Sequence, residues 1–285
     1  MRYKGRRQSS NVEDRRGMST GKKVGIRGGI FAVIALVVYV ILGGDPQMAL
    51  NFLQSGTQTT ENATDYQPSA QEEELAEFIA VVLADTEDVW HNLFREMGLQ
   101  YREPNIVLFN GQVQSACGFS SAATGPFYCP GDDRIYIDLL FLEQLQKRLG
   151  AGGDFAIAYI VSHEVGHHVQ KQLGTLDEVH SLQQQVSQSQ YNELTVRLEL
   201  QADFYAGVWA HHAQKMKNIL EEGDLEEAFN AAQAVGDDRL QMKSQGYVVP
   251  DSFTHGTSAQ RMSWFRKGYS TGNLNDGNTF EPNAI

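Results

Sequence analysis

The most apolar segment of the chain is the 17-residue run from Gly28 to Gly44, GGIFAVIALVVYVILGG. Its Ile, Val, Leu and Phe content leaves no polar face for the surface of a globular domain, and ~17–25 such residues span a bilayer. A buried core helix and a cleavable signal peptide are the alternatives. The basic leader is long for a signal peptide, and no small-x-small cleavage site follows the run. The segment therefore predicts a membrane anchor in contact with the lipid bilayer.

Charge is distributed unevenly around this segment. The chain carries a formal net charge of −12, yet residues 1–27 contain nine Lys and Arg against two acidic residues. Because basic flanks stay on the cytoplasmic side of a membrane, the N-terminus is expected inside and everything after Gly44 outside the cytoplasm. The acidic remainder argues against a protein that binds nucleic acid, since such proteins need positive charge to neutralise phosphates.

The chain is expected to divide into a basic cytoplasmic tail (1–27), the anchor (28–44), a flexible linker (45–74) and one folded domain (75–285). The linker is polar and offers almost no apolar side chains to pack. The folded domain begins with apolar residues at helical spacing, continues with short runs typical of β-strands, and ends in further helical patterns. This order of elements indicates the α+β class. The first helix is predicted over 75–97, and the strands over 106–109, 126–129 and 134–137.

Two cysteines, Cys117 and Cys129, lie within the region of predicted strands. Adjacent antiparallel strands can bring residues at this spacing within reach of each other. In an oxidising compartment a disulfide is the expected state, whereas two buried free thiols are the alternative for a cytosolic chain. Because the domain is expected outside the cytoplasm, we predict a Cys117–Cys129 bridge.

The stretch 154–174, DFAIAYIVSHEVGHHVQKQLG, predicts a helix that carries metal ligands. Valines and an isoleucine recur every four residues as its buried stripe, and Gly174 can end it. Within it His163, Glu164 and His167 form the pattern H-E-x-x-H. Two histidines four residues apart lie one turn apart on one face and can bind one zinc ion, while the glutamate can take a proton from a metal-bound water.

A catalytic zinc site needs a third protein ligand on another element. A second helix is predicted over 191–209, and it places Glu199 and Asp203 on one face. Glu199 as ligand and Asp203 as the acceptor that orients a ligand histidine would explain both carboxylates. Two solvated carboxylates are the alternative, and Glu193 is a competing third ligand without an acidic partner four residues later.

These motifs, HEVGHH (163–168), ELQAD (199–203) and the preceding ACGFSSAATGPFYCPGDDRIYID (116–138), closely resemble the bacterial putative neutral zinc metallopeptidase family. This is a single-anchor group of the gluzincin class, and the resemblance covers nearly the whole chain. It implies a zincin-like domain with a small antiparallel sheet, an H-E-x-x-H helix and a glutamate helix. It also implies a position in the bacterial inner membrane with a periplasmic catalytic domain, His163, His167 and Glu199 as zinc ligands, and Glu164 as general base.

A further segment, Thr254-His255-Gly256 followed by Arg261, looks like the T-H-P/G…R element of membrane-associated gluzincins. There the histidine faces the oxyanion and the arginine supports the site, as a donor to the developing charge would. His255 as an ordinary loop residue is the alternative. The remaining histidines considered, His168, His211 and His212, are expected to have no metal role.

The sequence thus predicts a membrane-anchored endopeptidase that uses Zn²⁺ and acts on proteins or peptides. The strand around Ile135 is expected to bind substrate backbone by β-augmentation. One alternative is an anchored scaffold whose zinc is structural or absent, and another is an acidic partner-binding module. Glu164 favours a catalytic over a structural zinc site, because a structural site needs metal ligands but no general base beside a metal-bound water. No motif specifies the oligomeric state.

Overall fold

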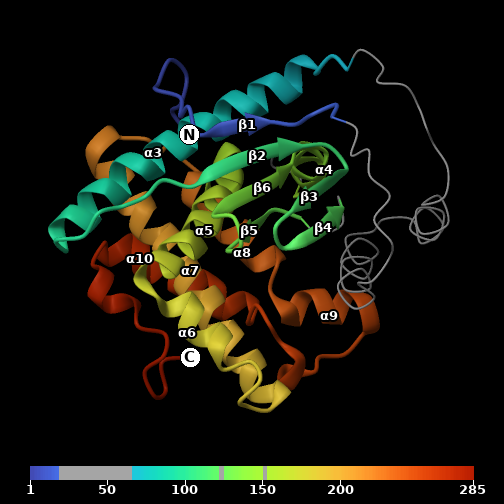
Figure 1. Ribbon diagram of the computed structural model, residues 1–285, viewed down its shortest axis with the longest axis vertical. Helices are drawn as coiled ribbons and strands as arrows, with labels where there is room; N and C mark the ends of the chain where they lie inside the picture. Colours follow the sequence, from blue (N-terminus) through green and yellow to red (C-terminus); the bar gives the residue numbers. More distant parts are fainter. Residues whose placement is uncertain (19–65, 122–124, 150–152) are drawn as a thin grey trace.

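The computed structural model describes residues 1–18, 66–121, 125–149 and 153–285 (Figure 1). The predicted anchor at 28–44 lies outside these residues, as does most of the predicted linker. Among the residues described, no helix is both long and apolar enough to cross a bilayer.

A mixed four-stranded sheet, in the order β1–β2–β6–β5, forms the β layer of the fold (Figure 1). Strand β2 (Asn105–Phe109) pairs parallel with β6 (Arg134–Asp138), and β5 (Phe127–Cys129) pairs antiparallel with β6. The predicted all-antiparallel sheet is therefore wrong for the β2–β6 pair. Residues 110–133 lie between these two strands, and a connection of that length allows the chain to return in the same direction.

Alternate residues of the strands enter two separate cores, as the two-residue period of a strand requires. Ile106, Leu108, Ile135 and Ile137 belong to the main core, together with apolar residues of the helices. The intervening Val107 and other residues of the opposite face form a smaller core that includes Val113 of a hairpin. This hairpin consists of β3 (Gln112–Ser115) and β4 (Gly118–Ser121).

The first residues of the chain are part of this fold. Strand β1 (Val12–Asp14) pairs parallel with β2, and Ser9 donates its backbone N–H to Ala80 O at 2.9 Å. Arg6 forms an ion pair with the buried Asp85 at 2.5 Å, and Arg7 pairs with Glu87 at 2.9 Å. Residues 1–18 therefore pack on the same body as the residues described between 66 and 285.

Gly17 and Tyr66, which lie on either side of the undescribed segment 19–65, touch each other. A Cβ atom on Gly17 would lie 2.4 Å from Cβ of Tyr66, and Gly17 has φ +72°. The Tyr66 hydroxyl donates to Glu72 Oε1 at 2.5 Å and accepts a hydrogen bond from Asn110 at 2.8 Å. The described residues on either side of the segment 19–65 therefore lie next to each other.

Helices make up most of the remaining structure that is described. The first begins at Ala70, inside the predicted linker, because Ser69 and Glu72 form a capping box. The helix that begins at Asp224 is preceded by Gly223, which makes no side-chain cap, whereas Thr257 and Gln260 form a capping box at the start of the helix at Ser258. The helices are α3 (Ala70–Glu96), α4 (Leu139–Leu149), α5 (Asp154–Leu173), α6 (Thr175–Ser181), α7 (Gln188–Lys217), α8 (Asp224–Ala234), α9 (Asp237–Gln245), α10 (Ser258–Thr271) and the 3₁₀ turns η2 (Pro250–Ser252) and η3 (Leu274–Gly277).

Two glycines allow α7 and α10 to cross at very short range. A Cβ on Gly207 would lie 2.1 Å from Phe265 O, and one on Gly268 would lie 2.1 Å from Phe204 O. Any larger residue would force the helices apart. This close crossing brings side chains of α10 to the face of α7 that carries the predicted carboxylates.

The predicted disulfide is present. Cys117 and Cys129 are bridged, with their Cα atoms 5.8 Å apart. The bridge ties the β3–β4 hairpin to the end of β5, two elements that belong to different sheets.

Candidate metal centre

Helix α5 presents His163 and His167 on one face, with ring centroids 4.8 Å apart. The residue between them that faces α7 is Gly166, where a Cβ would lie 3.0 Å from Ala202 O. The absence of a side chain at this position lets α5 and α7 approach closely. The approach brings the histidines within reach of Glu199 on α7.

Glu199 lies between the two imidazoles. His163 Nε2 is 3.2 Å from Glu199 Oε2, and His167 Nε2 is 3.5 Å from Glu199 Oε1. One ligand atom from each of the three residues can be chosen so that all lie within 4.8 Å of one another. The structure therefore brings together the three ligands expected from sequence.

The three side chains fit a zinc ion. In a tetrahedral site with Zn–N and Zn–O bonds of about 2.0–2.1 Å, neighbouring ligand atoms lie about 3.3 Å apart. Each Nε2 has one Glu199 oxygen at a similar distance, 3.2 Å to Oε2 and 3.5 Å to Oε1, and the set with one atom from each residue lies within 4.8 Å. Nδ1 of each histidine is bound to another residue, Asp203 for His163 and Gln170 for His167. The nitrogen that each ring can offer to a metal ion is therefore Nε2, and both Nε2 atoms lie next to Glu199.

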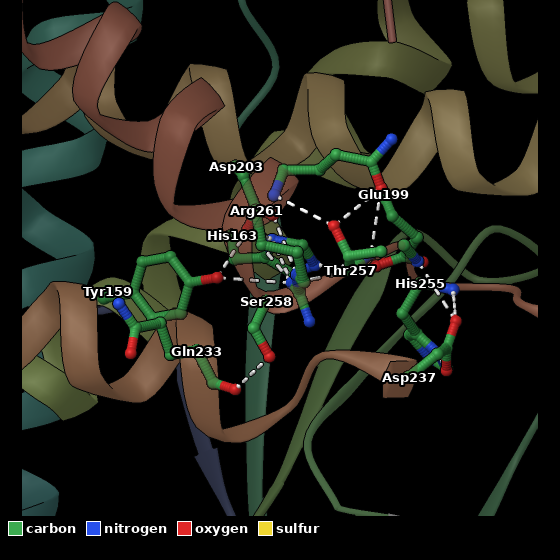
Figure 2. A network of polar contacts seen from close by, with 12 residues as sticks. Tyr159, His163, Glu199, Asp203, Gln233, Asp237, His255, Thr257, Ser258 and Arg261 are labelled. Atoms are coloured by element: carbon green, nitrogen blue, oxygen red, sulfur yellow. Dashed lines mark hydrogen bonds and ion pairs between the residues drawn. The ribbon is translucent and has the colours of Figure 1, made fainter. Parts of the chain in front are cut away.

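Asp203 accepts hydrogen bonds from three surrounding side chains (Figure 2). Its Oδ1 accepts from His163 Nδ1 at 2.8 Å and from the hydroxyl of Tyr159 at 2.5 Å. Arg261, on α10, donates from Nε to Oδ2 at 2.8 Å and from Nη2 to Oδ1 at 3.0 Å. The structure thus places Asp203 and Arg261 in the supporting positions expected for them.

The charges of this group stabilise one another despite burial. Burial disfavours a charged carboxylate, but Arg261 and His163 outweigh it and lower the pKa of Asp203. Burial also opposes protonation of His163, yet Asp203 and Glu199 raise the pKa of that imidazole to about 10 in the metal-free chain. Binding of a metal ion therefore has to release this proton.

Glu164 lies in the turn of α5 between the two histidines and is 8% exposed. Successive side chains of an α-helix are rotated by about 100° around its axis, so the Glu164 side chain points in a direction between those of His167 and His168. His168 faces β5, since its Nδ1 lies 3.0 Å from the hydroxyl of Tyr128. Glu164 therefore faces the space between the metal ligands and the edge of the sheet.

His255 lies in the loop before α10, and Asp237 at the start of α9 holds it (Figure 2). Asp237 Oδ2 accepts the backbone N–H groups of Thr254, His255 and Gly256 at 2.6–3.0 Å, and Oδ1 lies 3.3 Å from His255 Nδ1. Removal from water would lower the pKa of His255, but the hydrogen bond that its imidazole donates to Asp237 and the charge of Glu199 raise that pKa. The His255 side chain is 48% exposed, so it remains accessible from solvent.

The other candidates of the sequence lie elsewhere. Glu193 pairs with Arg197 at 2.8 Å on the surface, with its side chain 59% exposed. His168 binds Tyr128 and the carbonyl oxygen of Arg102, while His211 and His212 bind backbone carbonyl oxygens. These residues do not contribute to the cluster of potential metal ligands.

Sequence reasoning missed two polar residues of α5, Tyr159 and Gln170. Each lies one turn from a ligand histidine, Tyr159 four residues before His163 and Gln170 three residues after His167. Both are buried, at 2% and 0% exposure. Their helical spacing from the H-E-x-x-H motif was the available signal.

Comparison with known proteins places these residues in a wider context. A family model described as putative neutral zinc metallopeptidase matches residues 1–280. The uncharacterized protein YpfJ of Escherichia coli K12 is 49% identical over 285 residues, covering 98% of this chain and 99% of its own. The uncharacterized protein Mb2605 of Mycobacterium bovis is 44% identical over 190 residues, 63% of each chain. No solved structure matches the chain.

Proposed function

The chain belongs to the family of putative neutral zinc metallopeptidases, and on that basis we propose that it is a zinc-dependent endopeptidase with Glu164 as general base. One observation carries the proposal. The free Nε2 atoms of His163 and His167 converge on the Glu199 carboxylate, while Glu164 occupies the same turn of α5 without being one of the three potential ligands. A three-ligand set beside a glutamate is the arrangement of a hydrolytic rather than a structural zinc site.

The mechanism follows from where these side chains lie. His163, His167 and Glu199 would hold the zinc ion, which would supply a Lewis acid that activates water and polarises the substrate carbonyl. Glu164 takes the proton of the attacking water and then delivers it to the leaving amine nitrogen. His255, which Asp237 holds in the loop before α10, donates a hydrogen bond to the carbonyl oxygen as it becomes negative.

The predicted substrate strand requires a correction. Ile135 belongs to β6, which pairs with β2 on one side and β5 on the other, so β6 has no free edge to add a strand. Within the described residues, β5 is the end of the sheet on the side of α5. We propose that an extended peptide aligns along β5, where Glu164 and the metal ligands would lie beside it.

We propose that the metal centre lies outside the cytoplasm, because disulfides such as Cys117–Cys129 persist in oxidising compartments. A single crossing at 28–44 would place β1 and β2 in different compartments, so their pairing supports an N-terminus on the same side as the metal centre. The basic residues that predicted this orientation are also used by the fold, as Arg6 and Arg7 show. We therefore place residues 1–18 in the same compartment as the metal centre.

The decisive experiment loads the purified full-length chain with zinc and incubates it with an unstructured protein such as casein. We expect cleavage by the wild type and none above background by Glu164→Gln at equal zinc content. Equal cleavage by both proteins would rule out Glu164 as the base. Stoichiometric zinc with no cleavage of casein or of a diverse peptide library would favour the structural-zinc alternative.

A further inference from the structure

Gln170 makes contacts that define the state of His167. Its Oε1 lies 2.9 Å from His167 Nδ1. Its amide nitrogen donates to Leu198 O at 2.7 Å and to Gln201 Oε1 at 3.1 Å. Gln170 is fully buried, so these contacts account for its polar groups in the absence of bulk water.

The backbone carbonyl of Leu198 fixes which end of the Gln170 amide faces the histidine. A carbonyl oxygen can only accept a hydrogen bond, so the Gln170 nitrogen must face Leu198 and its oxygen must face His167. An oxygen at that position accepts from an N–H group, which requires the proton of the neutral His167 imidazole to be on Nδ1. Nε2 then carries the free lone pair that a metal ion needs.

Gln201 supports this orientation from α7. Its oxygen accepts from Gln170, and its own amide nitrogen donates to Gly277 O at 3.0 Å. Because Gly277 O is also an acceptor only, the Gln201 amide cannot rotate without losing that hydrogen bond. A chain of hydrogen bonds therefore runs from η3 through Gln201 and Gln170 to His167.

We propose that Gln170 is a positioning residue that holds His167 in the Nδ1–H tautomer with Nε2 free for metal, and that Gln201 fixes the amide of Gln170. The inference rests on the proposed zinc site. His163 and His167 are thus oriented by different means. A carboxylate neutralised by Arg261 orients His163, whereas a neutral amide orients His167 without adding a second buried charge beside Glu199.

The first test measures the tautomer of His167 directly in the metal-free wild-type chain. Nitrogen chemical shifts of ¹⁵N-labelled imidazoles distinguish the two neutral tautomers from each other and from the imidazolium, so spectra are compared at a pH where the His167 signals show the neutral ring. We expect the Nδ1–H form for His167, and a mixture or the Nε2–H form in Gln170→Leu. An Nε2–H tautomer in the wild type would overturn the proposal, whether or not any variant folds.

The second test measures zinc affinity by competition with a chromophoric chelator. Gln170→Leu should weaken zinc binding about 10–100-fold, as changes to residues that orient a ligand do. The matched control is Gln172→Leu on the same helix, which loses two hydrogen bonds to the Arg102 backbone but touches no ligand. We expect the control to bind zinc as the wild type does. Equal affinity of both variants would overturn the proposal.

Thermal unfolding of the metal-free variants separates positioning from general stability. If Gln170→Leu and Gln172→Leu have similar midpoints, a difference in zinc affinity reflects the orientation of His167. Gln201→Leu should weaken zinc binding less than Gln170→Leu, because Leu198 O still holds the Gln170 amide. Neither readout uses peptidase activity, so a chain that binds zinc as expected but cleaves nothing would contradict the proposed function and leave this inference intact.

Discussion

Arg261 and Asp203, 58 residues apart in the chain, form a two-point contact in which Nε is 2.8 Å from Oδ2 and Nη2 is 3.0 Å from Oδ1. Arg261 is 3% exposed and Asp203 is completely buried. A buried carboxylate without a cation would tend to take up a proton. By keeping Asp203 ionised, Arg261 preserves the acceptor that orients His163.

Removal of Arg261 should therefore destabilise the fold as well as the site. Arg261→Leu leaves the buried Asp203 with only His163 to balance its charge, and removing one partner of a buried pair costs about 3–5 kcal/mol. We expect a corresponding loss in the free energy of unfolding, measured with urea on the metal-free chain. Arg266→Leu, an exposed position on the same helix, is the control. An unfolding free energy equal to that of the control would contradict the structural importance of the pair.

Four substitutions distinguish the ligands, the base and the orienting carboxylate. Glu164→Gln should keep nearly stoichiometric zinc and lose about 10²–10⁴-fold in rate, as removal of a general base does. Glu199→Gln and His167→Ala should lower zinc affinity, since each removes one of three protein ligands. Asp203→Asn should weaken zinc affinity or activity about 10–100-fold. Zinc loss in Glu164→Gln, or full zinc retention in Glu199→Gln, would show that the roles are assigned wrongly.

The features of the site that could be predicted from sequence depend on spacing within one helix. His163 and His167 share a face of α5, and Glu199 and Asp203 share a face of α7, whatever the rest of the fold does. Gln170 was not recognised because a glutamine near the end of a helix usually faces solvent. Its burial depends on the close approach of α7, which no local pattern reveals.

Pairing between strands that are distant in the sequence could not be predicted either. A run such as Arg134–Asp138 indicates a strand but contains no information on its neighbours, so the central position of β6 could not be foreseen. The same holds for β1, a three-residue strand in a basic segment whose arginines suggested a cytoplasmic tail. The carboxylates that pair with these arginines lie about 80 residues away in the chain, as the Arg6–Asp85 and Arg7–Glu87 ion pairs show.

The pH dependence of peptidase activity should reveal the protonation of His255. Its pKa is raised, so the imidazolium that donates to the oxyanion persists to higher pH and is lost only as pH rises through that raised pKa. Asp237→Asn removes the charge that helps raise it, so the fall of kcat/KM on the alkaline side should move to lower pH. His255→Gln should lose about 10²–10³-fold in kcat and abolish that fall. An unchanged alkaline limb in Asp237→Asn would show that His255 does not act as this donor.

The disulfide should be recovered from protein made in its native compartment. Non-reducing mass mapping is expected to find Cys117 and Cys129 in one linked peptide. Replacement of both by Ser should lower the free energy of unfolding by about 2–4 kcal/mol, the usual effect of a bridge that closes a short loop. Two free thiols in protein isolated from the cell envelope would contradict the proposed compartment.

The shared location of the N-terminal segment and the metal centre can be tested in whole cells. Lys4 and Lys243 are exposed, the first on residues 1–18 and the second on α9. Because the native cysteines are bridged, Lys4→Cys and Lys243→Cys each introduce a single free thiol. A thiol reagent that does not cross the inner membrane should label both variants in cells with a permeabilised outer membrane, and a cytoplasmic cysteine protein serves as the unlabelled control. Labelling of Lys243→Cys alone would mean that β1 does not pair with β2 in the native protein, and labelling of neither would place both on the cytoplasmic side.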